Sequence, residues 1–296
     1  MKISKPHLVL RIDAEQCAFE ARVNDFPAFN NVPGFPLTCD IPVNPCAFSG
    51  ENSLSLRVRP VPGQSAFAPR AQCALTLAVR PNDQPEAALR GITDIKFAAA
   101  QLDQNSGMAG SARAGRCDSG GDFRADLTGD VSVGELAVQH DRERNILTGS
   151  RKVEMELPLP NWVWRNSQLI EDSPASHALL LEQYRAFWTL LSEQRVPEAL
   201  AACQLKVREL AAASYSNVAD VEGRLELGDM ITSPELTLFR FRPEGLRLEV
   251  LGFGRLARLV DSDGDYPVVF LENDHSLAHQ IPLIYCKTGE DWQIIR

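Results

Sequence analysis

The chain has 296 residues, 44% of them hydrophobic and 23% charged, and a formal net charge of −9. This length predicts one large or two medium domains with a core that needs no disulfide or metal staple. The composition disfavours a disordered chain, and the acidic balance disfavours a nucleic-acid binder, which needs a basic face.

Short alternating strands fill the first half of the chain. Apolar side chains recur at every second position, with turn residues such as Asn24 and Asp25 between the runs, and no helical period appears before residue 160. We therefore predict an antiparallel β-sandwich or jelly roll over residues 1–160. A glycine-rich stretch at 104–123 is expected to be a loop or long hairpin tip. The expected strands lie at 7–13, 17–23, 35–41, 54–58, 73–80, 131–140 and 146–157, with a turn at 49–52.

Helical periodicity begins after a predicted linker at 161–172. Ser173 and Pro174 mark a helix start, and the apolar stripe that follows is Leu180, Tyr184, Phe187 and Leu191. A second helix is expected from Val196, with a stripe of Leu200, Cys203, Val207 and Leu210. Alternating patterns return after residue 214. Residues 173–296 are thus predicted to form an α+β domain, a helical pair packed on an antiparallel meander.

Three resemblances add to this interpretation. Residues 50–56, Gly-Glu-Asn-Ser-Leu-Ser-Leu, resemble the turn and strand of sugar-binding jelly-roll modules attached to glycosidases, which implies a jelly roll. The second half, with its aromatic helix and terminal strand at 289–295, resembles the cone-shaped fold of scytalone-dehydratase-like and nuclear-transport-factor-like proteins. That fold implies an enzyme, a pocket or a dimerisation module. The whole chain is similar in organisation to uncharacterised immunity-type proteins encoded beside bacterial secretion-system toxins.

Each candidate catalytic, metal or cofactor motif in the sequence is explained better as an ordinary structural feature. Asp261, Asp263, Asp265 and Glu272 follow the spacing of a calcium loop, but Tyr266 occupies the position that requires glycine, so we predict a polar hairpin turn. His275 and His279 with Asp274 lack a further ligand nearby in sequence. No nucleophile elbow or phosphate-binding loop occurs. We predict no cofactor and no enzymatic activity.

The cysteines and the N-terminus bear on the compartment. The chain has seven cysteines, an odd number without a CxxC pair, and most of them lie among apolar neighbours. This usage is typical of buried free thiols in a reducing compartment. No segment has the length of a signal peptide core or of the ~18 apolar residues that span a bilayer. We therefore expect a cytoplasmic protein that does not bind membranes.

The distribution of charge suggests a function. Residues 166–296 contain 12 Lys and Arg against 20 Asp and Glu, a net charge of −8. We predict a non-enzymatic inhibitor or immunity protein that binds a basic toxin or effector, because complementary charge speeds such association. An adaptor, dimerising through the meander, and a ligand pocket or enzyme in the C-terminal cone are the alternatives. The predicted binding residues are Asp261, Asp263, Asp265, Glu272, Asp274, Glu290 and Asp291.

Overall fold

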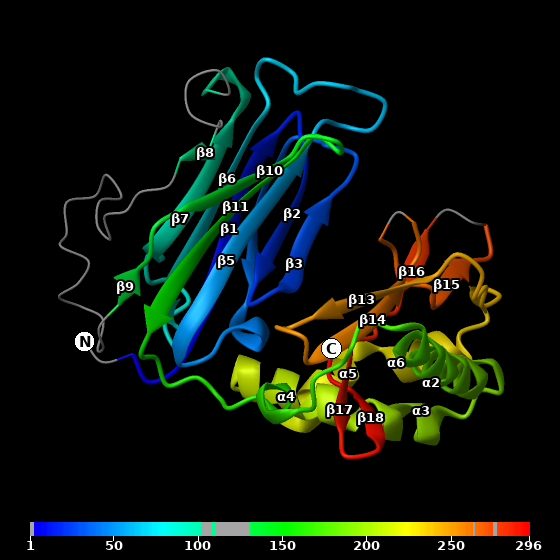
Figure 1. The fold of residues 1–296 in the computed structure, drawn as a ribbon. Coiled ribbons are helices and arrows are strands. Elements are labelled where there is room, and N and C mark those ends of the chain that lie inside the picture. The colour runs from blue at the N-terminus through cyan, green and yellow to red at the C-terminus, as the bar shows by residue number, and fades with distance from the viewer. Residues whose placement is uncertain (1–2, 102–107, 110–130, 263, 275–276) are drawn as a thin grey trace. The chain divides into compact units, whose positions relative to one another are not determined.

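The computed structural model describes residues 3–101, 108–109, 131–262, 264–274 and 277–296. The chain divides into two compact units, Met1–Pro160 and Asn161–Arg296. The described part of the chain is mostly β, in several antiparallel sheets, and its α-helices belong to the second unit (Figure 1). The predicted antiparallel β structure and the mixture of helices and strands in the second half are thus confirmed.

One sheet of the first unit has the strand order β4-β1-β6-β7-β8. In β1, which lies between β4 and β6, the alternate side chains of Leu8, Leu10 and Ile12 are at most 1% exposed. This alternation is what half-buried strands require, since successive side chains point to opposite faces. The strands are β1 (Pro6–Glu15), β4 (Leu37–Pro42), β6 (Gln72–Pro81), β7 (Arg90–Ala98) and β8 (Met108–Ala109).

A second sheet has the order β10-β11-β5-β2-β3, with β9 also paired to β11. Leu54, Leu56 and Val58 of β5 are fully buried, and side chains from both sheets join one hydrophobic cluster. The strands are β2 (Ala18–Val23), β3 (Phe26–Asn31), β5 (Gly50–Arg59), β9 (Ser132–Val133), β10 (Ala137–Asp141) and β11 (Ile146–Met155).

Three local predictions for the first unit were wrong or incomplete. The strands β3 and β7 were not predicted, because neither shows a clean apolar alternation. The turn expected at 49–52 is replaced by the start of β5 at Gly50. Asn52 explains this, since its side-chain amide donates to the carbonyls of Phe48 and Gly50, both at 2.8 Å, and so turns the chain before the strand. Of the glycine-rich stretch 104–123, only residues 108–109 lie within the described residues, as β8.

The first predicted helix of the second unit is confirmed. It is α2 (Pro174–Ser192), with Ser173 as N-cap and the expected four side chains buried. The second predicted helix divides at Cys203 into α3 (Val196–Ala202) and α4 (Gln204–Ser214). Two further helices, α5 (Val218–Leu225) and α6 (Leu227–Thr232), were not predicted; they precede the strands that return from Leu236 onward.

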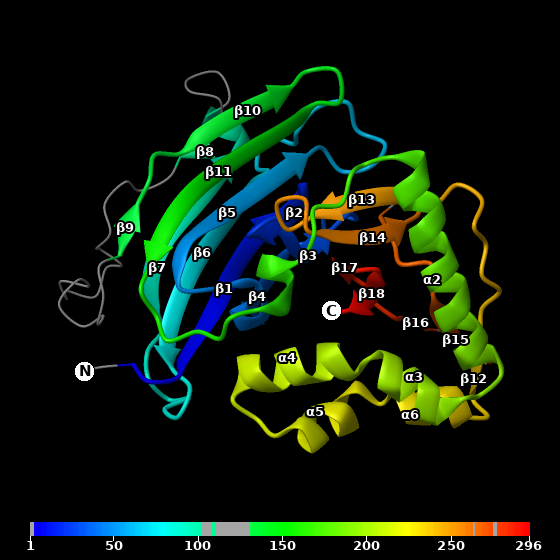
Figure 2. The same cartoon turned by 60° about the horizontal axis from the view of Figure 1, so that its bottom comes forward.

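The reason for α5 is a local cap. The side-chain oxygen of Asn217 accepts a hydrogen bond from the main-chain N–H of Asp220 at 2.8 Å, which satisfies one of the free donors at the helix start. Val221 then packs with Val207 and Ala211, so that α4 and α5 share a small apolar cluster. The two helices lie side by side in Figure 2.

The strands of the second unit form two sheets, and the prediction of a single meander was wrong. One sheet has the order β12-β15-β16 and the other β13-β14-β17-β18, because the chain leaves the second sheet after β14 and returns at β17. The strands are β12 (Leu236–Leu238), β13 (Arg247–Leu251), β14 (Leu256–Val260), β15 (Val269–Glu272), β16 (Ala278–Gln280), β17 (Tyr285–Thr288) and β18 (Asp291–Ile294).

Residues 161–172, for which the sequence predicts a linker, are bonded to the second unit. The main-chain N–H of Val163 donates to the Glu209 carboxylate at 2.7 Å, and that of Ile170 donates to the carbonyl of Gly254 at 2.7 Å. Trp162 and Trp164, which as an alternating pair could have formed a sugar-stacking platform, are each about 1% exposed.

Candidate functional site

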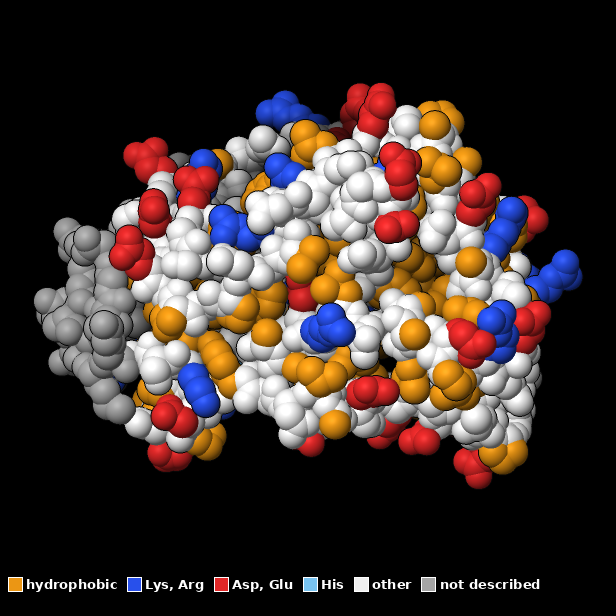
Figure 3. Space-filling model, turned by 90° about the horizontal axis from the view of Figure 1, so that it is seen from below, with side chains coloured by type: hydrophobic (Ala, Val, Ile, Leu, Met, Phe, Trp, Pro, Cys, Tyr) orange, Lys and Arg blue, Asp and Glu red, His pale blue; other side chains and the backbone are white. Residues whose placement is uncertain are grey.

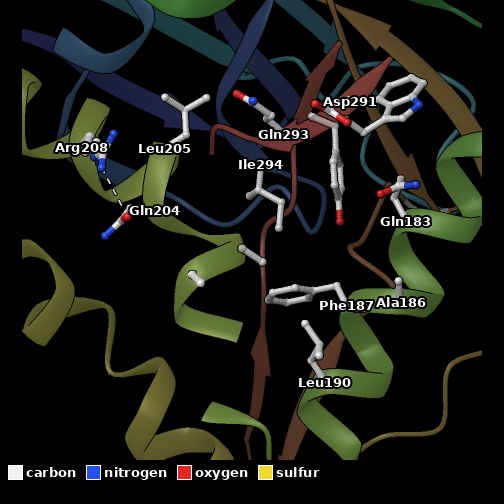
Figure 4. A pocket seen from close by; sticks show the side chains of 14 residues that line it. Gln183, Ala186, Phe187, Leu190, Gln204, Leu205, Arg208, Asp291, Gln293 and Ile294 are labelled. Atoms are coloured by element: carbon white, nitrogen blue, oxygen red, sulfur yellow. Dashed lines mark hydrogen bonds between the residues drawn. The ribbon is translucent and has the colours of Figure 1, made fainter. Parts of the chain in front are cut away.

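A hollow of about 540 Å³ opens in the second unit beside β18. Figure 4 shows its lining, with side chains from α2 on one side, from the α3–α4 region on another, and from β18 above them. The residues are Gln183, Ala186, Phe187, Leu190, Ala201, Ala202, Gln204, Leu205, Arg208, Tyr285, Asp291, Trp292, Gln293 and Ile294. Its volume falls in the range of small-ligand and peptide-side-chain sites.

The walls of the hollow combine apolar and amide side chains. Phe187 and Ile294 belong to the hydrophobic core of the unit and point toward one another in Figure 4. Gln183 and Gln293 lie nearer the surface, and the Arg208 guanidinium donates to the side-chain oxygen of Gln204 at 3.3 Å. An occupant would therefore meet apolar surface together with groups that both donate and accept hydrogen bonds.

Tyr285 is the unusual polar group of this lining. Its side chain is buried, and its hydroxyl has no hydrogen-bond partner among the described residues. Burial, reinforced by Tyr184 and Cys203 nearby, raises its pKa well above the ordinary value, so the phenol stays protonated. A buried hydroxyl without a partner is uncommon in folded proteins and calls for an explanation.

The hydroxyl of the neighbouring Tyr184, in the same core, has hydrogen-bond partners. The two rings lie 5.4 Å apart. The Tyr184 hydroxyl donates to the carbonyl of Leu283 at 2.6 Å and accepts from the main-chain N–H of Leu259 at 3.1 Å. Tyr184 therefore joins α2 to two segments of the β structure, whereas the hydroxyl of Tyr285 makes no such bond.

Buried charged groups near the hollow have hydrogen-bond partners within the fold. The Glu209 carboxylate accepts from the Arg296 guanidinium at 2.7 Å, and that guanidinium lies 5.4 Å from the centre of the Trp162 ring. The Lys206 ammonium donates to the carbonyl of Pro282 at 2.9 Å, and burial lowers its pKa to about 8. These groups fasten α4 to the surrounding chain and explain how one helix can carry both interior charges and the wall of the hollow.

The predicted acidic residues do not form one cluster. Asp261 follows the end of β14, and its side chain accepts from the main-chain N–H of Asp265 at 2.9 Å, as in a polar turn. Glu272 lies 3.5 Å from the His279 imidazole, and Asp274 is exposed. Asp263 lies outside the described residues, as does His275.

Glu290 and Asp291 lie elsewhere, at the turn between β17 and β18. Leu256 at the start of β14 pairs with Cys286, so the β17–β18 turn extends past that start, whereas Asp261 follows the opposite end of β14. Both acids are exposed, and neither forms an ion pair with a described residue. Asp291 alone among the predicted residues lines the hollow.

On the face seen in Figure 3, Asp and Glu side chains do not gather in a single patch. No group of three or more His, Cys, Asp or Glu side chains within the described ranges could hold a metal ion. None of the described helices is long and apolar enough to cross a membrane.

Sequence analysis did not single out Tyr285, Trp292 or the glutamines of the hollow. Tyr285 and Trp292 appeared only as members of terminal strands, since a strand pattern does not say which helix lies opposite. Phe187 was correctly placed on the buried stripe of α2, and it is also a wall of the hollow.

No protein-family model, no curated protein and no solved structure matches the chain significantly.

Proposed function

We propose that this chain is a non-enzymatic protein-binding protein of the inhibitor or immunity type, and that its second unit docks a basic partner such as a toxin or effector. The observation that carries the proposal is the β17–β18 turn. There the exposed carboxylates of Glu290 and Asp291 stand without an ion-pair partner among the described residues, next to an open hollow.

The contrast with the interior acids supports a docking role. The less exposed Glu209 and Glu249 are paired with Arg296 and Arg258, at 2.7 and 2.6 Å. The carboxylates of Glu290 and Asp291 are left to the solvent, where they attract positive charge. Complementary charge at the rim of an interface steers a partner into contact and mainly raises the association rate.

For the first unit we propose a β-sandwich fold. The support is that its two antiparallel sheets contribute side chains to one continuous hydrophobic cluster. Two sheets that bury their apolar faces against each other are the usual arrangement for such a cluster.

The test compares two pairs of acids in the full chain. The partner to be tested is any basic, toxin-like protein encoded beside the gene of this chain, and association is followed by surface plasmon resonance at low and high salt. We expect rapid binding that slows at least about ten-fold with added salt. The double change Glu290→Gln with Asp291→Asn should slow association several-fold at low salt.

The matched control is Glu235→Gln with Glu244→Gln, which removes the same charge from exposed positions outside the hollow and the β17–β18 turn. It should leave the association rate unchanged. Equal effects of the two double changes, or binding that is indifferent to salt, would contradict docking at the β17–β18 turn. A basic neighbour that does not bind the wild-type chain at all would remove the proposed function.

A further inference from the structure

β18 is the edge strand of its sheet. In the order β13-β14-β17-β18 it pairs with β17 on one side, from Thr288 opposite Asp291 to Tyr285 opposite Ile294. No described strand pairs with its other side. A free edge presents main-chain N–H and carbonyl groups that another extended chain can bind.

The hollow lies along this free edge. Its lining includes four successive residues of β18, Asp291, Trp292, Gln293 and Ile294. Successive side chains of a strand point to opposite faces of the sheet. The hollow therefore borders this strand over its whole length, and α2 and α4 form its other walls (Figure 4).

The lining suits a peptide better than a purely apolar ligand. Phe187, Leu190 and Ile294 offer apolar surface for a side chain that points inward. Gln183 and Gln293 carry amides, which donate and accept hydrogen bonds as peptide groups do.

We infer that the basic partner docks by adding an extended segment to the free edge of β18. Alternate side chains of this segment are apolar and enter the hollow, while basic side chains meet Glu290 and Asp291. The inference rests on the proposed function and specifies how the binding is made: main-chain hydrogen bonds supply the affinity, and the hollow and the two acids select the sequence.

The direct experiment uses a capped five-residue peptide of alternating lysine and valine as probe, with the full chain. Hydrogen exchange followed by NMR should show new protection of main-chain amides in Asp291–Ile294. Binding of so short a peptide is expected at a Kd of about 0.1–1 mM. The same peptide with N-methylated valines should bind at least about ten-fold more weakly, because it cannot complete the strand pairing. A copy with glutamate in place of lysine should also bind more weakly, because it meets the two acids.

Two variants test the hollow itself. Leu205→Trp fills it and should abolish binding of the probe, whereas Ala212→Trp adds the same ring at an exposed position of α4 and should not.

The outcomes separate this inference from the proposed function. If the full-length partner binds in a manner that depends on Glu290 and Asp291 while the amides of β18 stay unprotected, the strand-addition inference is overturned and the function stands. Absence of probe binding at millimolar concentration also overturns it. If sedimentation shows a dimer whose β18 amides are already protected without peptide, a second copy of the chain occupies the edge instead.

Discussion

Burying the charged ammonium group of a lysine costs free energy, and this cost lowers the pKa of the group. Lys206 shows this effect. Its ammonium makes one hydrogen bond, to the carbonyl of Pro282, and burial lowers its pKa from 10.5 to about 8. Between these two values the unfolded chain holds a proton that the folded chain has released. Stability supplied by this group therefore rises with pH across the window from 8 to 10.5.

We expect Lys206→Met to remove this dependence. The difference in unfolding free energy, wild type minus variant, should rise by about 2 kcal/mol between pH 7 and pH 10, at about 1.4 kcal/mol per pKa unit. Urea unfolding followed by tryptophan fluorescence measures it, because all four tryptophans lie beyond residue 161. Burial raises the pKa values of Cys203 and Cys286, so these thiols make the unfolding free energy fall as the pH rises. Both proteins contain them, and subtracting the variant from the wild type removes their effect. A difference that stays flat with pH would show that Lys206 keeps its proton in the folded chain.

At the residue scale, the sequence predicts which side chains are buried better than it predicts which polar groups are hydrogen-bonded. The stripe of Tyr184 and Phe187 followed from a helical period, and both side chains are buried. The unlike hydroxyls of Tyr184 and Tyr285 could not be predicted, since each depends on main-chain groups brought near from distant segments. Asp291 was predicted on charge alone, and the same argument selected Asp261, which is used in a turn.

At the scale of elements, three buried asparagines hold the loops of the first unit. Asn52 is 2% exposed and forms four bonds: its amide donates to Phe48 and Gly50, and its side-chain oxygen accepts from Asn24 and from the main-chain N–H of Phe48. Asn24 in turn accepts from the main-chain N–H of Ser53 at 2.8 Å. Asn44 joins β1 to the helical turn before β5 through Leu8 and Pro6.

Asn52→Ala should therefore destabilise the first unit by about 3 kcal/mol, because it leaves several buried groups without a partner at about 1–3 kcal/mol each. The exposed Asn30→Ala on β3 is the control and should change stability by less than about 0.5 kcal/mol. Hydrogen exchange of the β5 amides reports on this unit directly. Similar losses for the two variants would mean that the network adds nothing beyond strand propensity.

Helices and strands were predicted correctly where the hydrophobic period extends over many residues. The prediction failed where a helix cap or a sheet edge determines the structure. The alternation of apolar and polar residues was sufficient to predict β5, and the apolar stripe was sufficient to predict α2. α5 and α6 were missed because each is short and α5 depends on the cap at Asn217. The split into two sheets after β14 has no local signal, since Asp261–Asp265 reads as an ordinary turn.

At the scale of the whole molecule, each unit has a core of its own. The large cluster of the first unit draws on residues up to Leu157 and its neighbour Leu159, and that of the second begins at Ile170. A unit with its own core can in principle fold alone. We expect the separate segments 1–160 and 161–296 each to unfold cooperatively in urea. Segments that are soluble only when combined would contradict this.

The pairing of β5 has a consequence for how the chain is made. β5 lies between β2 and β11, and Leu56 pairs with Ala21 on one side and Gly149 on the other. The ribosome has finished β2 before β5, but β11 follows roughly 90 residues later, about 5–20 s of synthesis. Throughout that interval an apolar strand stands with one side open, so the nascent chain should be a client for chaperones that shield such strands until β11 emerges.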